Sequence, residues 1–320
     1  MTDREFKKLK SKVLERLRKG AYIITTFYDE TIINDKEVAL ALVKNYSLAL
    51  RDLNYKNRDD EEIVRCAMTG SFRAYDYASN RLKRKVSIGE FAMTLYPYIY
   101  QHLDPKLRNN KTITSMAVEY NPSYFEYASK NLKKDKKYVI ELLEKYKNVQ
   151  GIKEICKFMD DELKKDKEIT LVAIQTDFQS LEYFDESVKK DKEVAIAAVN
   201  IHGKAIGYLD QSFKKSKCIV LIALKTYPQL FNHLDNVLQA DYDIIKLMLE
   251  LHPKFTAENS TFMGNYNKYL LEYQIKQNLF LQSQIQQLED RIANIEENVI
   301  KDDNKEYSGT SRKRSKLKLK

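Results

Sequence analysis

The sequence predicts an all-α protein in which about nine two-helix repeats of 25 residues stack into an α-solenoid. Three observations support this class. A 25-residue pattern of apolar and acidic positions recurs along most of the chain. The 320 residues include only 8 Gly and 5 Pro, whereas sandwiches and barrels need many turn residues. Charged residues make up 32% of the chain beside 43% hydrophobic residues, a balance typical of amphipathic helices.

The expected domain order follows from where this repeat begins and ends. We expect an N-terminal helical cap over 1–34, a helical repeat array over 35–261, a C-terminal helix with a coiled coil over 262–300 and a disordered basic tail over 301–320. The first residues lack the apolar stretch of a secretory signal, and no run of 18 or more apolar residues occurs. We therefore expect no membrane insertion and a cytoplasmic location, or a nuclear one in a eukaryotic cell.

The first helix of each repeat is expected to begin at one of nine equivalent positions. These starts are residues 35, 60, 85, 110, 135, 166, 191, 216 and 241, with a six-residue insertion before the sixth. Asp occupies six of them, and Asp is a favourable N-cap because its carboxylate accepts hydrogen bonds from first-turn N–H groups. Seven positions later, six repeats carry alanine, which lets neighbouring helices approach closely: Ala67, Ala92, Ala117, Ala173, Ala198 and Ala223.

A second, shorter helix is expected after a break at the twelfth position of each repeat. Proline is tolerated in the first turn of a helix but not in its interior. The residues that mark the break are Pro97, Pro122, Pro228, Pro253 and Gly203. The connector that follows carries an apolar anchor such as Leu82 or Leu132. One repeat cannot bury its apolar faces alone, whereas stacked repeats can, so the pattern predicts a solenoid.

The repeat resembles a known family of helical repeats. Residues 191–199 read DKEVAIAAV, and residues 203–209 read GKAIGYL. These phrases are similar to the repeat of domain of unknown function 4116, and the similarity extends over residues 35–255. The resemblance implies a short helical repeat but no mechanism. The third and fifth repeats depart most from the pattern, through a non-acidic opening at 86–89 and an insertion near 148–154.

An aromatic column recurs in the second helix of the predicted repeat. It forms a candidate groove for a peptide, since rigid amphipathic rings are good contact residues. Its members are Tyr77, His102, Tyr127, Tyr183, Tyr208 and His233. The alternative, which we favour, is that these rings pack between repeats and keep their polar tips in water.

Paired basic residues recur in the connectors. The pairs are Lys83-Arg84, Lys133-Lys134, Lys164-Lys165, Lys189-Lys190 and Lys214-Lys215. Aligned along a solenoid, they form a ridge suited to phosphates. Because each pair lies beside an acidic residue and a helix start, we favour the alternative that they solvate a loop.

The sequence offers no basis for catalysis, a metal site or a cofactor. Cys66, Cys156 and Cys218 show no CxxC spacing, and their odd number leaves no complete disulfide framework. His102 and His233 belong to the aromatic column, which we also call the aromatic ladder, and His202 and His252 lie at turn positions. No HExxH, GxSxG or glycine-rich phosphate loop occurs. We therefore expect a noncatalytic protein without catalytic residues, metal ligands or cofactors.

Residues 262–300 change to the spacing of a coiled coil. Apolar residues at a and d positions form a candidate dimer seam: Leu281, Ile285, Leu288, Ile292, Ile295 and Val299. In a parallel pair, Arg291 at g faces Glu296 at the following e of the partner helix, which favours a homodimer. Alternatively, a flanking group folds back to cap the last repeat: Tyr266, Tyr269, Leu270 and Tyr273.

The C-terminal tail carries most of the net positive charge. Its cations form a candidate anion-binding segment: Arg312, Lys313, Arg314, Lys316, Lys318 and Lys320. The formal net charge is +9, so residues 1–311 carry only +3. The segment from Lys313 to Lys316 resembles a nuclear-import signal.

These features favour a noncatalytic interaction scaffold. We expect the concave face of the solenoid to bind a protein partner and the C-terminal helix to pair two copies. The alternative function is nucleic-acid binding through the basic tail and the connector lysines.

Overall fold

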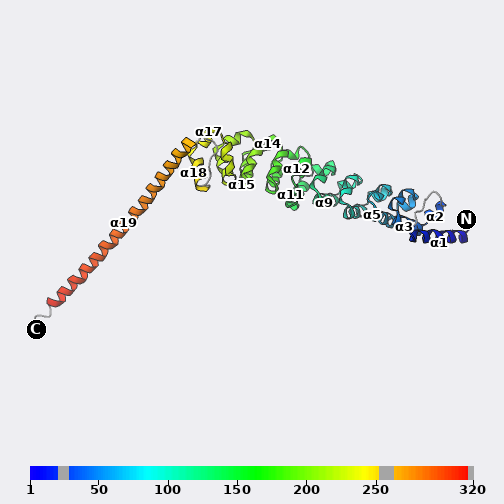
Figure 1. Cartoon of the computed structure of the whole chain (residues 1–320), viewed down its shortest axis with the longest axis horizontal. Helices are drawn as coiled ribbons and strands as arrows, with labels where there is room; N and C mark the ends of the chain where they lie inside the picture. Colours follow the sequence, from blue (N-terminus) through cyan, green and yellow to red (C-terminus); the bar gives the residue numbers. More distant parts are fainter. Residues whose placement is uncertain (21–28, 252–262, 316–320) are drawn as a thin grey trace. The chain divides into compact units, whose positions relative to one another are not determined.

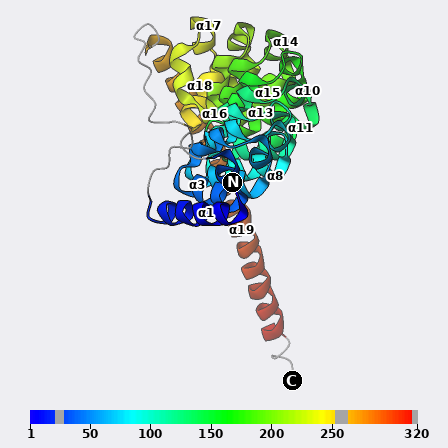
Figure 2. The same ribbon diagram turned by 90° about the vertical axis from the view of Figure 1, so that its right-hand side faces the viewer.

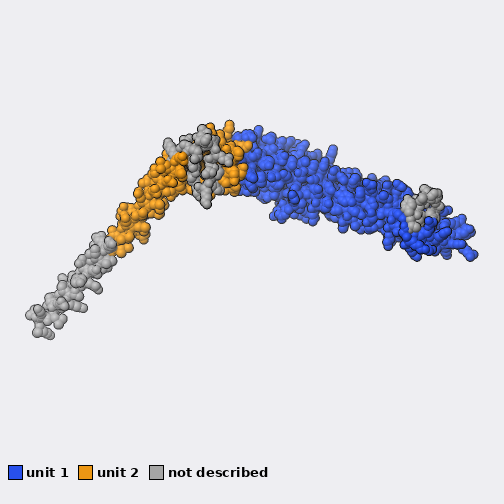
Figure 3. Space-filling model, in the orientation of Figure 1, with its two compact units in different colours: residues 1–213 blue, residues 214–320 orange. Residues whose placement is uncertain are grey.

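The computed structural model describes residues 1–20, 29–251 and 263–315. All regular elements in these ranges are helical, and no strand occurs in them. The chain divides into two compact units, Met1–Phe213 and Lys214–Lys320, which are coloured separately in Figure 3. The predicted all-α repeat fold is confirmed.

The first helix of every predicted repeat is present, and we refer to these elements as A helices. Each has ten residues and begins one residue after the predicted start. They are α3 (Lys36–Asn45), α5 (Glu61–Gly70), α8 (Val86–Leu95), α9 (Lys111–Tyr120), α11 (Lys136–Lys145), α13 (Lys167–Thr176), α15 (Lys192–Ile201), α16 (Lys217–Thr226) and α18 (Tyr242–Leu251). The periodicity therefore located all nine starts.

The N-caps explain this register. The Asp191 carboxylate accepts hydrogen bonds from the N–H groups of Glu193 at 2.8 Å and Val194 at 3.1 Å. Equivalent double caps occur at Asp35, Asp60, Asp166 and Asp241. Such a cap satisfies N–H groups that the first turn of a helix leaves without an intrahelical acceptor, so the A helix starts at the same point in each of these repeats.

The second segment of most repeats is a six-residue 3₁₀ helix. These segments are η2 (Ser47–Asp52), η3 (Pro97–His102), η5 (Pro122–Tyr127), η7 (Phe178–Tyr183), η8 (Gly203–Tyr208) and η10 (Pro228–His233). The second and fifth repeats have short α-helices instead, α6 (Ala74–Tyr77) and α12 (Glu154–Phe158). The sequence placed the second segment correctly, and most of these segments adopt the tighter 3₁₀ form, which is common in short helical pieces.

Short helical connectors complete the repeats. They are α2 (Glu30–Ile33), α4 (Tyr55–Arg58), α7 (Asn80–Lys83), η4 (Leu107–Asn109), α10 (Lys130–Lys134), η6 (Leu163–Lys165), α14 (Glu186–Lys189), η9 (Gln211–Lys215) and α17 (Asn236–Gln239). Main-chain hydrogen bonds join successive connectors. The Ser79 N–H donates to the Arg58 carbonyl at 2.8 Å, and the Asp185 N–H donates to the Lys164 carbonyl at 3.1 Å. The connectors are thus fixed to one another.

The A helices of the first compact unit pack in chain order. α1 (Asp3–Arg18) contacts α3, α3 contacts α5, and the succession continues through α8, α9, α11 and α13 to α15 (Figure 1). Figure 2 shows this unit from its N-terminal end, with α1 in front. The alanines of the seventh column are fully buried: Ala67, Ala92, Ala117, Ala173, Ala198 and Ala223. Packing between neighbours in sequence is the defining feature of a solenoid.

Buried tyrosines add polar contacts to these junctions. The Tyr75 hydroxyl donates to the Lys83 carbonyl at 2.7 Å and accepts from the Asp104 N–H of the next repeat at 3.0 Å. Burial raises the pKa of Tyr75 to about 12. The hydroxyl therefore stays protonated at neutral pH and keeps both hydrogen bonds.

The second compact unit contains α16, α18 and the long helix α19 (Met263–Ser315). α16 packs against α18, and α18 contacts α19. α19 contains the predicted coiled-coil segment and continues to Ser315. Its last turn contains Arg312, Lys313 and Arg314, whereas Lys316, Lys318 and Lys320 lie outside the described residues. Within the described ranges, no helix combines the length and apolar content that crossing a bilayer requires.

Candidate interaction surfaces

An ion-pair ladder joins successive A helices at their N-terminal ends. Lys167 Nζ of α13 lies 2.9 Å from Asp191 Oδ2 and 2.5 Å from Glu193 Oε2 of the next repeat. The arrangement recurs for Lys10 with Asp35 and Glu37, Lys36 with Asp60 and Glu62, Lys136 with Asp166 and Glu168, and Lys217 with Asp241 and Asp243. Each lysine offsets the charge of a cap carboxylate, so the ladder is mainly a structural feature.

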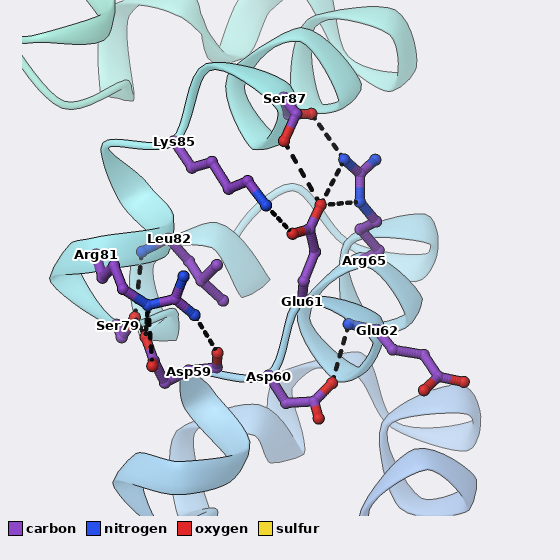
Figure 4. Close-up of polar contacts among 10 residues, drawn as sticks. All are labelled: Asp59, Asp60, Glu61, Glu62, Arg65, Ser79, Arg81, Leu82, Lys85 and Ser87. Carbon is purple, nitrogen blue, oxygen red and sulfur yellow. Dashed lines mark hydrogen bonds and ion pairs between the residues drawn. The ribbon is translucent and has the colours of Figure 1, made fainter.

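The ladder is reversed between the second and third repeats (Figure 4). The third repeat starts with Lys85 instead of Asp, and Lys85 Nζ pairs with the Glu61 carboxylate of α5. Arg65 Nε donates to Glu61 Oε1 at 3.0 Å, and Arg65 Nη2 donates to the Ser87 carbonyl at 3.0 Å. These contacts hold α8 in register although it lacks a side-chain cap.

The connector lysines, the candidate phosphate ridge, are largely engaged within the protein. Lys165 Nζ lies 2.9 Å from Glu162 Oε1, and Lys189 Nζ lies 3.0 Å from Glu186 Oε1. Further pairs are Arg84 with Asp104, Lys134 with Asp160, and Lys164 with Asp161. A phosphate would have to compete with these carboxylates, so the ridge is a weak anion site.

The aromatic ladder lies on the second segments of the repeats. Its four tyrosines are half-buried, and its two histidines are exposed. The His102 ring lies 6.1 Å from the ring of Phe72 in the preceding repeat, and the Tyr208 ring lies 6.0 Å from Phe178 in the preceding repeat. Because these ring contacts cross repeat junctions, the ladder contributes to packing between repeats.

A more exposed aromatic surface lies on the turns that follow α5, α8 and α9, and we name it the aromatic edge. It comprises Phe72, Tyr96, Tyr98, His102, Tyr120, Tyr124 and Tyr127. Tyr98 is 39% exposed and packs edge-on against Phe72 at 5.2 Å, and Tyr120 is 58% exposed and stacks on Tyr124 at 6.1 Å. The segments η3 and η5, which carry most of these rings, contact each other. Clustered, partly exposed tyrosines are typical of protein contact surfaces.

The insertion in the fifth repeat forms one wall of a cleft of about 470 Å³. Val149 lines the cleft from the insertion, whereas Phe178 and Ile201 line it from the C-terminal ends of α13 and α15. Gly151 adopts φ +80°, a backbone conformation that side chains disfavour, and so permits the turn of the insertion. Polar side chains such as Gln150, Gln175 and Asp177 also line the cleft, so its walls are mixed in character.

The predicted dimer seam is a row of exposed apolar side chains on α19. Its members with described side chains are 53% to 62% exposed: Leu281, Ile285, Leu288, Ile292 and Ile295. Val299 lies in the same helix, but its side chain is outside the described ones.

The start of α19 behaves differently from the seam. Leu270 and Tyr273 are half-buried, and Lys276 Nζ lies 4.5 Å from the centre of the Tyr242 ring of α18. The side chains of Tyr266 and Tyr269 lie outside the described ones. The start of α19 thus contacts the last repeat, whereas the seam lies further along the same helix and is exposed. The two alternatives that the sequence offered concern different parts of one helix.

The cysteines and acidic side chains form no reactive constellation in the described parts of the chain. No group of three or more His, Cys, Asp or Glu side chains there is arranged to hold a metal ion. Burial raises the pKa of the Cys156 thiol to about 12, while Cys218 is exposed and Cys66 is half-buried. A buried neutral thiol is a poor nucleophile.

Comparison with known families matches this repeat geometry. The model described as Domain of unknown function (DUF4116) matches residues 29–83, 90–133, 115–149, 135–189, 166–214 and 191–239, which together span more than half of the chain. The chain belongs to the DUF4116 family. Three of the matches begin at the N-cap of an A helix, at Asp135, Asp166 and Asp191, and each of these matches extends over two successive repeats. No curated protein and no solved structure significantly matches this DUF4116 chain.

Two charged features of this DUF4116 chain were not predicted from its sequence. The lysine at the first position of many A helices and the acidic cap of the next repeat recur with the same period, and that correlation indicates the ladder. The concentration of cations in residues 1–20 was also overlooked, because the tail dominated the charge count.

Proposed function

We propose that this DUF4116 protein is a noncatalytic protein-interaction scaffold that pairs two copies through α19 and offers the aromatic edge to a protein partner. The observation that carries the proposal is the exposed apolar row on α19. Five large aliphatic side chains on one helix face are more than half exposed. Covering apolar surface is worth about 25 cal/mol per Å², so a second helix against this row is favourable.

A second copy of α19 is the occupant that suits the row best. Leucine occupies the d positions 281 and 288, and isoleucine occupies the a positions 285 and 292. This combination favours parallel two-stranded coiled coils. Arg291 at g and Glu296 at the following e provide an attractive charge pair between two parallel copies.

The aromatic edge supports a role for the solenoid beyond dimerisation. Tyr98 and Tyr120 present ring surface on neighbouring turns, and tyrosine gives large contact area at small cost in conformational entropy. The connector lysines are paired with carboxylates, so they give little support to the alternative function of nucleic-acid binding through the connectors.

Sedimentation equilibrium of the full-length chain tests the pairing. We expect a species of twice 37.6 kDa that dissociates on dilution. The Leu288→Asn/Ile292→Asn variant should remain monomeric, because polar side chains replace apolar ones at one d and one a position. Leu279→Asn/Phe280→Asn is the matched control, since both residues are 59% exposed but lie off the seam. A monomeric wild type, or equal loss of pairing in the control, would refute the coiled coil.

Capture from nuclease-treated native lysate tests the aromatic edge. Proteins retained by the wild-type chain should be lost with Tyr98→Ala/Tyr120→Ala. Tyr55→Ala is the control, because Tyr55 is 63% exposed but lies in the connector α4. If both variants retain the same proteins, the aromatic edge is not the contact surface.

A further inference from the structure

The positive charge of the chain is concentrated at both ends of the sequence. Residues 1–20 contain eight basic and three acidic side chains, a net charge of +5. The tail contributes +6 of the total of +9, so residues 21–311 carry −2. The N-terminal excess belongs to α1, a helix of 16 residues with a capping box formed by Thr2 and Glu5.

Most cations of α1 point away from its packing contacts, whereas Lys10 pairs with Asp35 and Glu37. Val13 and Leu17 are buried, and α1 packs against α3. At 100° per residue, Arg4, Lys8 and Lys12 lie opposite the buried side chains, and Lys7 and Arg18 flank them beside the half-buried Leu14. We name these five exposed cations the α1 cation face. None of the five forms an ion pair with the described residues, in contrast to the connector lysines. The acidic residue on this face, Glu15, is paired with Lys19 at 2.7 Å.

The cation face contains no apolar contact residue. Interfaces between proteins have cores depleted in charge and rich in aromatic residues, and the α1 cation face lacks such a core. Helices that lie on membranes insert an apolar face, whereas the apolar face of α1 is occupied by α3. A partner recognised by charge alone is a polyanion with regularly spaced charges.

The spacing of the cations suits a nucleic-acid backbone. Arg4, Lys8 and Lys12 follow one another at four-residue intervals, about 6 Å apart along the helix axis. Phosphates recur about every 3.4 Å along the axis of each strand of a duplex, so alternate phosphates lie about 6.8 Å apart. No aromatic ring lies on this face to stack on a base, and no Asn or Gln lies there to read one.

We infer that α1 is a sequence-independent binding site for the phosphate backbone of duplex nucleic acid, separate from the aromatic edge and the α19 seam. Five phosphate contacts correspond to a slope of about −4.5 in log K against log salt concentration for duplex DNA. The basic tail also contributes to this slope, so the contribution of α1 is measured as a difference in slope between full-length variants.

Fluorescence anisotropy with a duplex of about 20 base pairs, between about 50 and 200 mM salt, tests the assignment. Arg4→Gln/Lys8→Gln/Lys12→Gln should reduce the magnitude of the slope by about 2.7. The matched control is Lys164→Gln/Lys165→Gln/Lys189→Gln, which removes the same charge from ion-paired connector positions and should change the slope little. Thermal unfolding should be unchanged in the α1 variant, because the three side chains face solvent.

The following results would overturn the inference. An unchanged slope in the α1 variant, or an equal decrease in the connector control, removes the site from α1. A strong preference for one duplex sequence contradicts backbone recognition. If the α1 variant loses as much or more binding to polyglutamate, or to vesicles containing phosphatidylserine, as it loses to the duplex, the face belongs to an acidic protein or to a membrane surface. Duplex RNA of the same sequence, measured in parallel, shows which nucleic acid the face prefers.

Discussion

Replacing Asp191 separates the two contributions of a cap carboxylate to a repeat junction. Asp191→Ala removes the N-cap of α15, worth about 1 kcal/mol, and the ion pair with Lys167, worth up to about 1 kcal/mol at a partly exposed site. Lys167 keeps Glu193 as a partner, so the second term should lie near the lower end of its range. The expected total is about 1.5 kcal/mol.

Asp191→Asn is the variant that distinguishes the two terms. Asparagine caps helices as well as aspartate does but carries no charge, so only the ion pair is lost, at about 0.5 kcal/mol. Lys167→Gln removes this pair and also the pair with Glu193, so it should cost at least as much as Asp191→Asn. The double variant Lys167→Gln/Asp191→Asn should then cost little more than Lys167→Gln alone.

Hydrogen exchange measured by mass spectrometry on peptides from α15 reports this local free energy. Exchange by local opening should accelerate about tenfold in Asp191→Ala and about twofold in Asp191→Asn. Peptides from α3 and α5 should be unaffected, because contacts in a solenoid extend only to neighbours. Equal effects of Ala and Asn would show that the charge, not the cap, dominates. Acceleration in α3 would contradict nearest-neighbour packing.

Three further predictions concern thiols, acid and a strained turn. With a thiol reagent on the native protein, Cys218 should react rapidly and buried Cys156 only after unfolding; rapid reaction of Cys156 would contradict its burial. The hydrogen bond from Lys167 and the cap N–H groups lower the pKa of Asp191, and other cap aspartates are lowered likewise. The contribution of these aspartates to stability is therefore present above their unfolded pKa of about 3.9 and is lost as the pH falls through their lower folded pKa. The midpoint temperature of thermal unfolding should therefore drop when the pH falls below about 4. A midpoint temperature that rises on acidification would contradict this. Gly151→Ala should destabilise the protein by about 1 kcal/mol, because φ at this residue is +80°. Gly207→Ala is the control, since an added Cβ meets no atom within 4 Å, and it should not destabilise the protein. Urea unfolding measures both, and equal effects would argue against strain at the insertion.

The repeat register was predictable because apolar columns and caps are local signals with a fixed period. The nine helix starts follow from three signals that specify the same register: an apolar residue three positions after the start, a small residue seven positions after it in most repeats, and an acidic N-cap at the start itself in most repeats. The 3₁₀ geometry of the second segments was not predictable, since a six-residue apolar pattern fits either helix type.

The surfaces were harder to predict than the register. The rings of the aromatic ladder were predicted from their period, but the sequence did not distinguish its half-buried tyrosines from the exposed His102 and His233. Tyr98 and Tyr120 belong to no column of the pattern, so only their positions in space bring them to one edge. The α1 cation face required knowledge of which side of the helix packs against α3.

The account depends most directly on tight contact at the alanine column, and thermal unfolding of Ala198→Asp tests it. Ala198 is fully buried, so the variant places a carboxylate in the core, at a cost of several kcal/mol. With about 2 °C lost per kcal/mol in a chain of this size, the midpoint should fall by about 5 to 10 °C. Ala197→Asp, one residue away at a half-buried position, should change it by less than about 2 °C. Equal midpoints for Ala198→Asp and the wild type would contradict the stacked arrangement from which the exposed surfaces follow.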